Sequence, residues 1–267
     1  MSSQERTNPD RAGAAARWTA LQQIWDHEEL VQVSGGSAFL RWDIPAQLPS
    51  PALRLGSALA LPRHTQVRRN GLLVMGPPPD VDRLLATMVA EDLLPEPLGR
   101  VAVQRGSLDA VARHLPLADG NDWEWLCATE VPARVAAEDR VVRLEVADEP
   151  VIRELLAAGN PRTDARPFEH PDQHWAGVRG DDGSLLACGV REHNAAGYPH
   201  LSGITVHPSA RGTGLGVAVT ARLTREGVEE SGVCTLGMYS DNAVARRVYT
   251  GLGYGEVHLW SSRRLAR

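Results

Sequence analysis

The chain has 267 residues, 43% of them hydrophobic, which predicts a real core in one large domain or in two ordinary ones. The net charge of −5 argues against nucleic-acid binding through overall charge, and no apolar run approaches the roughly 18–20 residues that span a bilayer. Because residues 1–16 also lack the apolar segment of a signal peptide, we expect a cytoplasmic protein with no nucleic-acid or membrane partner.

The first half of the chain is expected to alternate strands and helices after a disordered tail over residues 1–16. Trp18, Leu21 and Trp25 fall at helical spacing, which predicts a helix over 17–30. The later elements expected here are a strand over 53–61, a strand over 72–75, a helix capped at Asp80, a strand over 100–104, a short helix over 107–114 and a strand over 123–129. This alternation is typical of the α/β class.

Two features of this half have alternative interpretations. A basic cluster precedes the turn Asn70-Gly71 and consists of Arg63, His64, Arg68 and Arg69. The cluster is either a solvated hairpin tip or a contact to an acidic ligand or to the other half of the chain. Trp123 and Trp125 share one face of a strand, where they either pack in the core or form an aromatic wall toward a substrate.

The second half restarts the alternation after a linker over residues 132–139. Its expected elements are a strand over 141–146, a helix starting at Asp148, a polar loop over 160–172, a hairpin of strands over 174–178 and 184–190, a strand over 200–206, a helix over 215–231, a strand over 233–239, a helix over 241–250 and a strand over 256–261.

Lysine and cysteine usage restrict the chemistry. All 28 basic residues are arginine, so a Walker-type phosphate loop, a pyridoxal Schiff base and a lysine general base are excluded. The three cysteines, Cys127, Cys188 and Cys234, are far apart and form no C-x-x-C pair. We therefore expect them to be reduced core residues.

A glycine-rich turn over residues 206–216 links an expected strand to the N-terminus of an expected helix. The first N–H groups of a helix have no partner within it, and glycine lets the backbone approach an anion, so this turn predicts a phosphate site. The dinucleotide pattern G-x-G-x-x-G fails, because its third glycine would fall at Val217.

Two sequence blocks identify a family resemblance. Arg211-x-x-Gly214-x-Gly216 resembles the pyrophosphate loop of the GNAT superfamily of acyl-CoA N-acyltransferases, and residues 242–254 resemble its N-x-x-A-x-x-x-Y-x-x-x-G-F/Y signature, with Tyr254 last. The resemblance covers about residues 140–262. It implies the GNAT fold: a central, mixed and mostly antiparallel sheet flanked by helices.

The domain arrangement is similar to that of tandem GNAT proteins of actinobacterial type. Residues 17–135 look like a degenerate GNAT-like domain that has neither signature, and residues 140–267 look like the catalytic one. The two halves are therefore expected to share one layout.

The resemblance implies acetyl-CoA (coenzyme A) as the acyl donor and no metal. The residues implied to bind it are Ile204, Thr205, Val206, Arg211, Gly212, Thr213, Gly214, Leu215, Gly216, Asn242 and Ala245. Asn242 would touch the pantetheine arm or order the following helix. Tyr249 would be the general acid for the departing thiolate, the alternative being a core aromatic.

The general base is harder to assign, because the strand over 201–206 has no carboxylate. Glu192 is the first choice among Glu192, His193 and His200, with Ser202 positioning a water. His170 and His174 have the spacing of metal ligands on a helix, but Pro171 between them argues against that helix, so we expect no metal site.

The leading functional hypothesis is an N-acetyltransferase that acylates a small-molecule amine by direct attack in a ternary complex. The alternative is a CoA-binding pseudoenzyme or a regulatory or sensor protein without turnover. A peptide or protein N-terminus as acceptor, and a homodimer, are left open. Free-thiol release from acetyl-CoA across amine classes separates the hypotheses.

Overall fold

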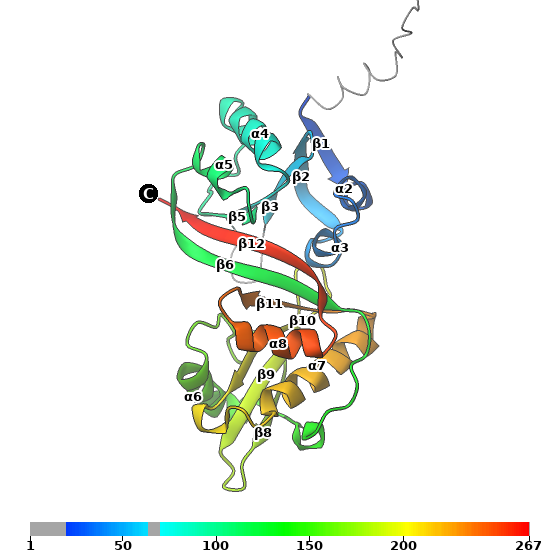
Figure 1. Ribbon diagram of the computed structural model, residues 1–267, viewed down its shortest axis with the longest axis vertical. Coiled ribbons are helices and arrows are strands. Elements are labelled where there is room, and N and C mark those ends of the chain that lie inside the picture. The colour runs from blue at the N-terminus through cyan, green and yellow to red at the C-terminus, as the bar shows by residue number, and fades with distance from the viewer. Residues whose placement is uncertain (1–19, 64–69, 267) are drawn as a thin grey trace, which may run out of the picture.

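A computed structural model describes residues 20–63 and 70–266 (Figure 1). The expected tail over 1–16, Trp18, and His64, Arg68 and Arg69 of the basic cluster lie outside these residues. The described strands form a twelve-stranded sheet in the order β1-β2-β3-β4-β5-β12-β6-β11-β10-β9-β8-β7. All its pairings are antiparallel except β4–β5 and β10–β11, so the predicted mixed, mostly antiparallel sheet is confirmed.

The first half contributes six strands and four helices, counted over the described residues. They are β1 (Gln22–Asp26), α2 (His27–Val33), α3 (Ala38–Asp43), β2 (Gln47–Leu55), β3 (Ala58–Arg63), β4 (Gly71–Met75), α4 (Pro78–Ala90), β5 (Arg100–Gln104), α5 (Leu108–Ala112) and β6 (Leu117–Ala128).

The second half contributes the other six strands and three α-helices within the described residues. They are β7 (Val142–Arg143), α6 (Glu149–Gly159), β8 (His174–Arg179), β9 (Leu185–His193), β10 (Pro199–Val206), α7 (Leu215–Ser231), β11 (Cys234–Tyr239), α8 (Ala243–Gly251) and β12 (Gly255–Leu265). Short 3₁₀ turns occupy Glu138–Arg140, Val146–Asp148 and Pro208–Ala210.

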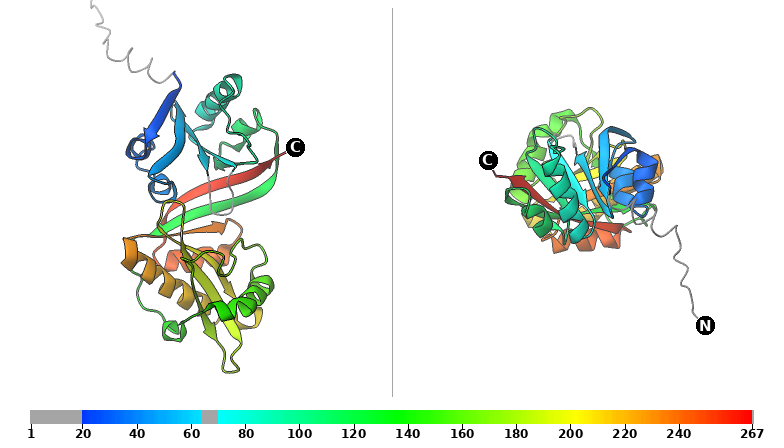
Figure 2. Two further views of the ribbon diagram at one scale, coloured as in Figure 1. Left: turned by 180° about the vertical axis from the view of Figure 1, so that it is seen from behind. Right: turned by 90° about the horizontal axis from the view of Figure 1, so that it is seen from above.

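The two halves exchange strands at the centre of the sheet. β12, the last strand of the second half, lies between β5 and β6, and the other edge of β6 pairs with β11. Figures 1 and 2 show β6 and β12 running side by side across the middle of the molecule. Hydrogen bonds of one continuous sheet therefore connect the halves, and the division into domains over 17–135 and 140–267 stays a proposal.

Both halves share one order of elements. The run β4-α4-β5-α5-β6 has the same sequence of strands and helices as the run β10-α7-β11-α8-β12. Each run also contains one of the two parallel strand pairs, β4–β5 or β10–β11. This repeat is the layout that a degenerate first copy would have.

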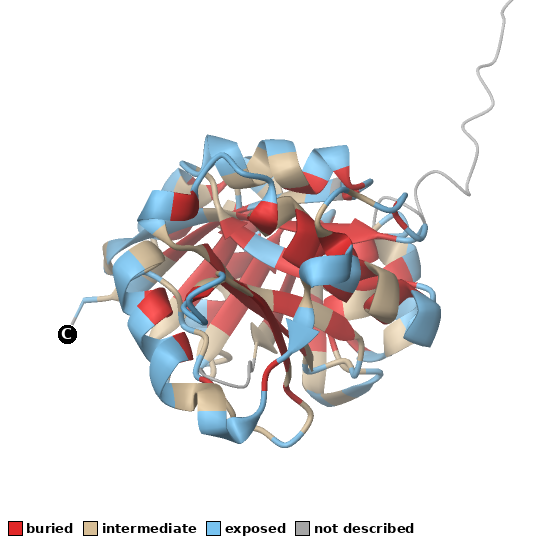
Figure 3. Cartoon of the chain, turned by 90° about the horizontal axis from the view of Figure 1, so that it is seen from below, coloured by how far each residue is buried: buried red, intermediate tan, exposed pale blue. Residues whose placement is uncertain are grey.

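Helices cover both faces of the sheet, and the residues of the strands between them are mostly buried (Figure 3). In the first half, α4 packs on one face through Leu84 and Leu85, while Phe39 of α3 packs with Trp125 and Trp260 on the other. In the second half, α7 and α8 share one core, and α6 packs with Trp175 in another.

The cysteines lie in these cores, as predicted. Cys127, Cys188 and Cys234 are buried and form no disulfide. Burial raises the pKa of the Cys188 and Cys234 thiols to about 12, so both stay protonated and unreactive at neutral pH. Within the described residues, no helix is both long enough and apolar enough to cross a bilayer.

Three expectations about local structure were wrong. The helix over 17–30 is replaced over Gln22–Asp26 by β1, where Ile24 is buried and the neighbouring Trp25 is 60% exposed, the alternation of a strand. The strand over 53–61 is a hairpin that turns at Gly56, whose φ of 61° suits glycine. Pro77, not Asp80, is the N-cap of α4.

Candidate active site

The strand before the glycine-rich turn separates from its neighbour. β10 pairs with β11 only at His200↔Thr235 and Leu201↔Leu236, and its pairing with β9 is irregular between Ser202 and Thr205. Gly203 lies in this irregularity with a φ of 63°. The two parallel strands therefore diverge after Leu201, and the gap is open to a ligand.

A cavity of about 1150 Å³ fills this gap and extends toward the first half. Most of the residues predicted to bind the donor line it, together with Glu192 and Tyr249: Ile204, Thr205, Val206, Arg211, Gly212, Gly214, Gly216, Asn242 and Ala245. Thr213 and Leu215 do not. The Thr213 hydroxyl donates to the carbonyl of Ala210, and Leu215 packs in the core. Their expected contribution is thus limited to the backbone.

The glycine-rich turn presents an open helix N-terminus to the cavity. Gly214 is the N-cap of α7, and both Gly212 and Gly214 have φ near 80° (80° and 82°), which favours glycine. A Cβ added at either position would meet no described atom within 4 Å. Because Gly214 has no side chain to cap them, the first N–H groups of α7 face this space, where the helix dipole favours an anion.

Arg211 extends this positive end of the helix. Its guanidinium donates to the carbonyl of Gly159, the last residue of α6, at 3.0 Å. Arg211 is exposed and lines the cavity, so a charge-assisted bond to a phosphate is within its chemistry.

Helix α8 begins with an N-cap formed by Asn242. The Asn242 side chain accepts a hydrogen bond of 3.0 Å from the N–H of Ala245. Of the roles expected for Asn242, ordering the following helix is the one that the structure displays. Asn242 and Ala245 both line the cavity.

Tyr249 lies two turns further along α8 and faces both core and cavity. Its side chain is 8% exposed, and its ring centroid lies 5.8 Å from that of Tyr254. Burial raises the pKa of the Tyr249 phenol to about 12. The hydroxyl has no hydrogen-bond partner among the described residues and lies on the cavity wall, so it holds a proton that a ligand can accept.

The carboxylate of Glu192 lies beside the point where β10 and β11 diverge. Glu192 is opposite His200 in the β9–β10 ladder. Its carboxylate accepts hydrogen bonds from Ser202 at 3.0 Å and from Gln173 at 2.8 Å. β10 itself has no carboxylate, but the hydrogen bond from Ser202 of β10 holds the carboxylate of Glu192 beside this strand.

The two histidines are held differently. The ring nitrogens of His193 lie 3.2 Å from Asp172 and 2.6 Å from Glu230, so carboxylates occupy both. Burial lowers the pKa of His200, whose Nδ1 lies 3.0 Å from the hydroxyl of Thr235, and this keeps the ring neutral at pH 7. All three base candidates line the cavity. Glu192 is the one that supplies a carboxylate, and a hydrogen bond from Ser202 holds this carboxylate next to β10.

The pair His170 and His174 does not lie on a helix. His170 is in the loop before β8, and His174 is the first residue of that strand. The spacing of metal ligands on one helix face therefore does not apply to them.

The first half closes the far side of the cavity with Arg63 and Trp123, for which the sequence left two interpretations open, and with Asp43, which it did not single out. Arg63 of β3 donates to Asp43 of α3 at 2.8 Å, and its guanidinium carbon lies 4.9 Å from the ring centroid of Trp123. All three residues line the cavity. Arg63 therefore contacts the shared cavity, and Trp123 is both a packed aromatic, stacked on Trp260, and part of the wall.

A loop of the second half covers the gap between β10 and β11. Arg162, beyond α6, lies with its guanidinium carbon 3.9 Å from the ring centroid of Tyr239 and pairs with Asp241 at 2.8 Å. Arg211, which follows β10, donates to the carbonyl of Gly159 just before this loop, and Arg162 in the loop contacts Tyr239 of β11. The loop therefore connects the ends of both strands.

Comparison with known proteins identifies the fold. The family model described as "FR47-like protein" matches residues 177–265. Among curated proteins, no sequence matches the chain significantly.

Solved structures resemble the chain over most of its length. A GCN5-related N-acetyltransferase from Kribbella flavida is 18% identical with a TM-score of 0.52, covering 89% of this chain and 95% of its own. A GNAT-family protein from Novosphingobium aromaticivorans is 20% identical with a TM-score of 0.51, covering 89% and 96%. An acetyltransferase from the GNAT family of Colwellia psychrerythraea is 13% identical with a TM-score of 0.51, covering 92% and 100%.

The solved structures match most of the chain, whereas the family model matches only its second half. At such identities the likeness to solved structures shows the fold. The chain therefore has the fold of the GNAT acetyltransferase structures, and its FR47-like segment over residues 177–265 contains both sequence signatures.

Proposed function

We propose that the chain is an acetyl-CoA-dependent N-acetyltransferase that acylates a small-molecule amine by direct attack in a ternary complex. The observation that carries the proposal is that one cavity contains a helix N-terminus without a side-chain cap, a protonated tyrosine and a carboxylate next to the diverging strands. These are the groups that acyl transfer from a thioester to an amine requires.

The donor-binding part of the cavity fits a pyrophosphate. The first N–H groups of α7 and the guanidinium of Arg211 would hold its oxygens, and the space over Gly212 and Gly214 lets them approach the backbone. Backbone groups of Ile204 and Val206, on the edge of β10 that turns away from β11, would pair with the pantetheine arm.

Glu192 and Tyr249 would perform the two proton transfers. An alkyl ammonium with a pKa of about 10 costs about 4 kcal/mol to deprotonate at pH 7, so a base is needed. Glu192, held by Ser202, would accept that proton directly or through a water. The amine nitrogen bonds to the thioester carbonyl carbon, the carbon–sulfur bond breaks, and the Tyr249 hydroxyl gives its proton to the departing thiolate.

The first half would bind the acceptor and no second donor. At its equivalent of the glycine-rich turn, α4 starts with Pro77, Pro78 and Pro79, which have no N–H to offer. Asp80 adds a negative charge there, because hydrogen bonds from the Ser57 N–H and from Arg83 lower its pKa. Residues 17–135 are accordingly proposed as a degenerate domain that covers the acceptor side of the cavity.

Free-thiol release from acetyl-CoA across classes of amine tests this function, with donor affinity measured separately by calorimetry. We expect donor binding together with amine-dependent thiol release. Donor binding without release for any amine would favour the alternative, a CoA-binding protein without turnover. Absence of donor binding would contradict both.

A further inference from the structure

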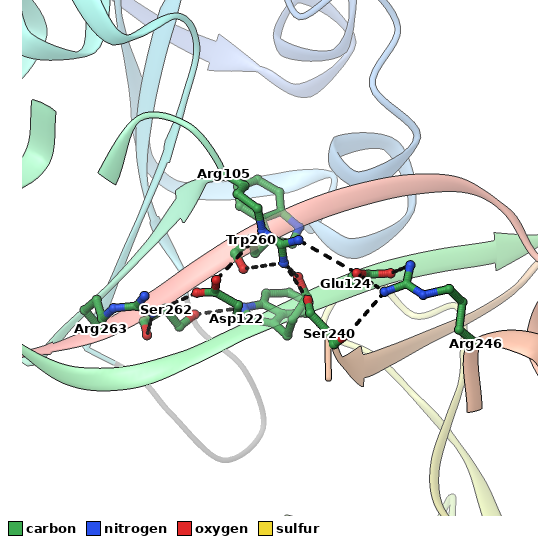
Figure 4. Close-up of polar contacts among 9 residues, drawn as sticks. Arg105, Asp122, Glu124, Ser240, Arg246, Trp260, Ser262 and Arg263 are labelled. Carbon is green, nitrogen blue, oxygen red and sulfur yellow. Dashed lines mark hydrogen bonds and ion pairs between the residues drawn. The ribbon is translucent and has the colours of Figure 1, made fainter. Parts of the chain in front are cut away.

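A buried carboxylate joins the first half of the chain to the helix that carries Tyr249. Glu124 lies on β6, is 1% exposed, and accepts hydrogen bonds from both terminal nitrogens of Arg246 on α8. A terminal nitrogen of Arg105, which follows β5, lies 3.8 Å from the same carboxylate. Figure 4 shows Glu124 between the two arginines. A carboxylate this buried depends on such partners, because an unpaired buried charge is strongly destabilising.

The same network holds the junction between β11 and α8. Arg246 also donates to the carbonyl of Ser240 at 3.3 Å, and Arg105 donates to the Ser240 hydroxyl (Figure 4). The N–H of Ser240 donates to the carbonyl of Asp122 on β6 at 3.0 Å. Ser240 lies two residues before Asn242, the N-cap of α8, so groups of the first half hold this helix at its start.

Helix α8 is less deeply buried than α7, and its Ala245 and Val248 are only partly buried against the core. Tyr249 is its single buried residue, whereas α7 buries nine residues. Arg246 lies one turn before Tyr249, on the neighbouring position of the same helix face. A displacement of Arg246 relative to β6 therefore displaces the Tyr249 hydroxyl relative to the cavity.

We propose that Glu124 is a positioning residue for Tyr249, so that the first half takes part in catalysis through α8 as well as through the cavity wall. This inference rests on the proposed function, in which Tyr249 protonates the departing thiolate. Glu124 itself does not line the cavity, so its effect on turnover passes through the helix.

Glu124→Gln in the full-length chain tests the inference, because glutamine keeps the volume and removes the charge. Glu138→Gln is the matched control: Glu138 is also 1% exposed and accepts hydrogen bonds from Arg225 of α7 at 3.0 and 3.3 Å. We expect both variants to lose similar stability. Only Glu124→Gln should lower kcat, by about tenfold to a hundredfold, the cost of a small misplacement of a reacting group.

A double-mutant cycle shows whether the effect passes through Tyr249. In a Tyr249→Phe background, Glu124→Gln should change kcat by less than about twofold, because the group that it positions is already gone. Multiplicative losses would overturn the inference. If Glu124→Gln does not fold, Arg246→Lys is the second variant. It removes the paired hydrogen bonds to Glu124 by changing a half-exposed side chain, and its kcat is measured with and without Tyr249→Phe.

Hydrogen exchange tests the physical contact without relying on turnover. Backbone amides of 243–251 should exchange faster in Glu124→Gln than in wild type, with α7 unchanged, and Glu138→Gln should leave α8 unchanged. If wild type releases no thiol with any amine, the proposed function fails while this comparison still decides whether Glu124 holds α8. Unchanged exchange of α8 in Glu124→Gln would overturn the inference, whatever happens to turnover.

Discussion

Ser202 donates a 3.0 Å hydrogen bond to the carboxylate of Glu192 at the position where β10 turns away from β11. The bond connects two neighbouring antiparallel strands: Ser202 is on β10, and Glu192 is on β9 opposite His200. It places a carboxylate at the open end of the gap between the parallel strands, where, in the proposed function, the amine would approach a thioester. The base in this account is therefore supplied by the strand next to the one that binds the donor.

Glu192→Gln is expected to lower kcat/KM by about a hundredfold at pH 7, within the usual range for general acid–base groups. The loss should shrink as pH approaches 10, because an alkyl ammonium of pKa about 10 is then half neutral without help. Rate measurements from pH 7 to pH 10 on wild type and variant check this. An equal loss of kcat/KM at every pH would show that Glu192 has a structural role and does not act as the general base.

Tyr249→Phe is expected to lower turnover by about 10²–10³-fold while acetyl-CoA affinity stays within a few-fold. Stability should change little, because the hydroxyl has no hydrogen-bond partner among the described residues. Turnover, calorimetry and thermal unfolding on one preparation measure all three.

Tyr254→Phe is the matched control, because Tyr254 shares the same signature and core. Its hydroxyl lies 2.9 Å from that of Thr224 and donates to Cys234 at 3.4 Å. Its removal should cost about 0.5–1.5 kcal/mol of stability and leave turnover intact. A wild-type rate in Tyr249→Phe would remove Tyr249 from the mechanism.

The pH dependence of kcat should show no alkaline decline due to Tyr249 below about pH 11. Burial disfavours the phenolate and raises the pKa of Tyr249 to about 12, so the acid form persists well above neutrality. A decline of kcat near pH 8 or 9 that disappears in Tyr249→Phe would contradict the raised pKa of Tyr249. Rates up to pH 10.5 on an acceptor that is already neutral there provide the measurement.

Gly214→Ala is expected to weaken acetyl-CoA binding by more than about tenfold, because the added methyl occupies the approach to the backbone N–H groups. Gly232→Ala is the matched control: Gly232 is the C-cap of the same helix, with a φ of 77° and the same open surroundings. Both variants incur left-handed strain of roughly 1–2 kcal/mol. Calorimetry should show weakened binding in Gly214→Ala alone; equal affinities would place the donor elsewhere.

One acetyl-CoA should bind per chain. The repeated order of elements supplies a second strand-to-helix turn at Pro77, but three prolines remove its N–H donors and Asp80 repels an anion. The stoichiometry from calorimetry checks this. A second tight site, retained in Gly214→Ala, would show that the first half binds the donor.

Local patterns were enough to predict the helices that border the proposed donor site. Periodicity and caps predicted the helices of 215–231 and 241–250 nearly to the residue, because these signals lie within the helices themselves. The expected hairpin of 174–178 and 184–190 ended before Glu192, which the structure places inside β9 and opposite His200.

The acceptor side could not be predicted, because it depends on contacts between distant segments. The insertion of β12 between β5 and β6 brings Trp260 beside Trp123, and the folding of the first half brings the Asp43–Arg63 pair to a cavity lined also by His200. Glu124 stands between Trp123 and Trp125 in the sequence and belongs to no motif. Its burial against Arg246 follows from the strand exchange, which no local pattern in either half indicates.

The yield of N-acetylated amine, measured by mass spectrometry after incubation with acetyl-CoA and a panel of amines, is the decisive test of the proposed acyl transfer. We expect an acetylated product with at least one small amine for wild type and for Gly232→Ala, and a large loss for Gly214→Ala and Tyr249→Phe. Equal product yields for wild type, Gly214→Ala and Tyr249→Phe, or no product from a protein that binds acetyl-CoA, would contradict it.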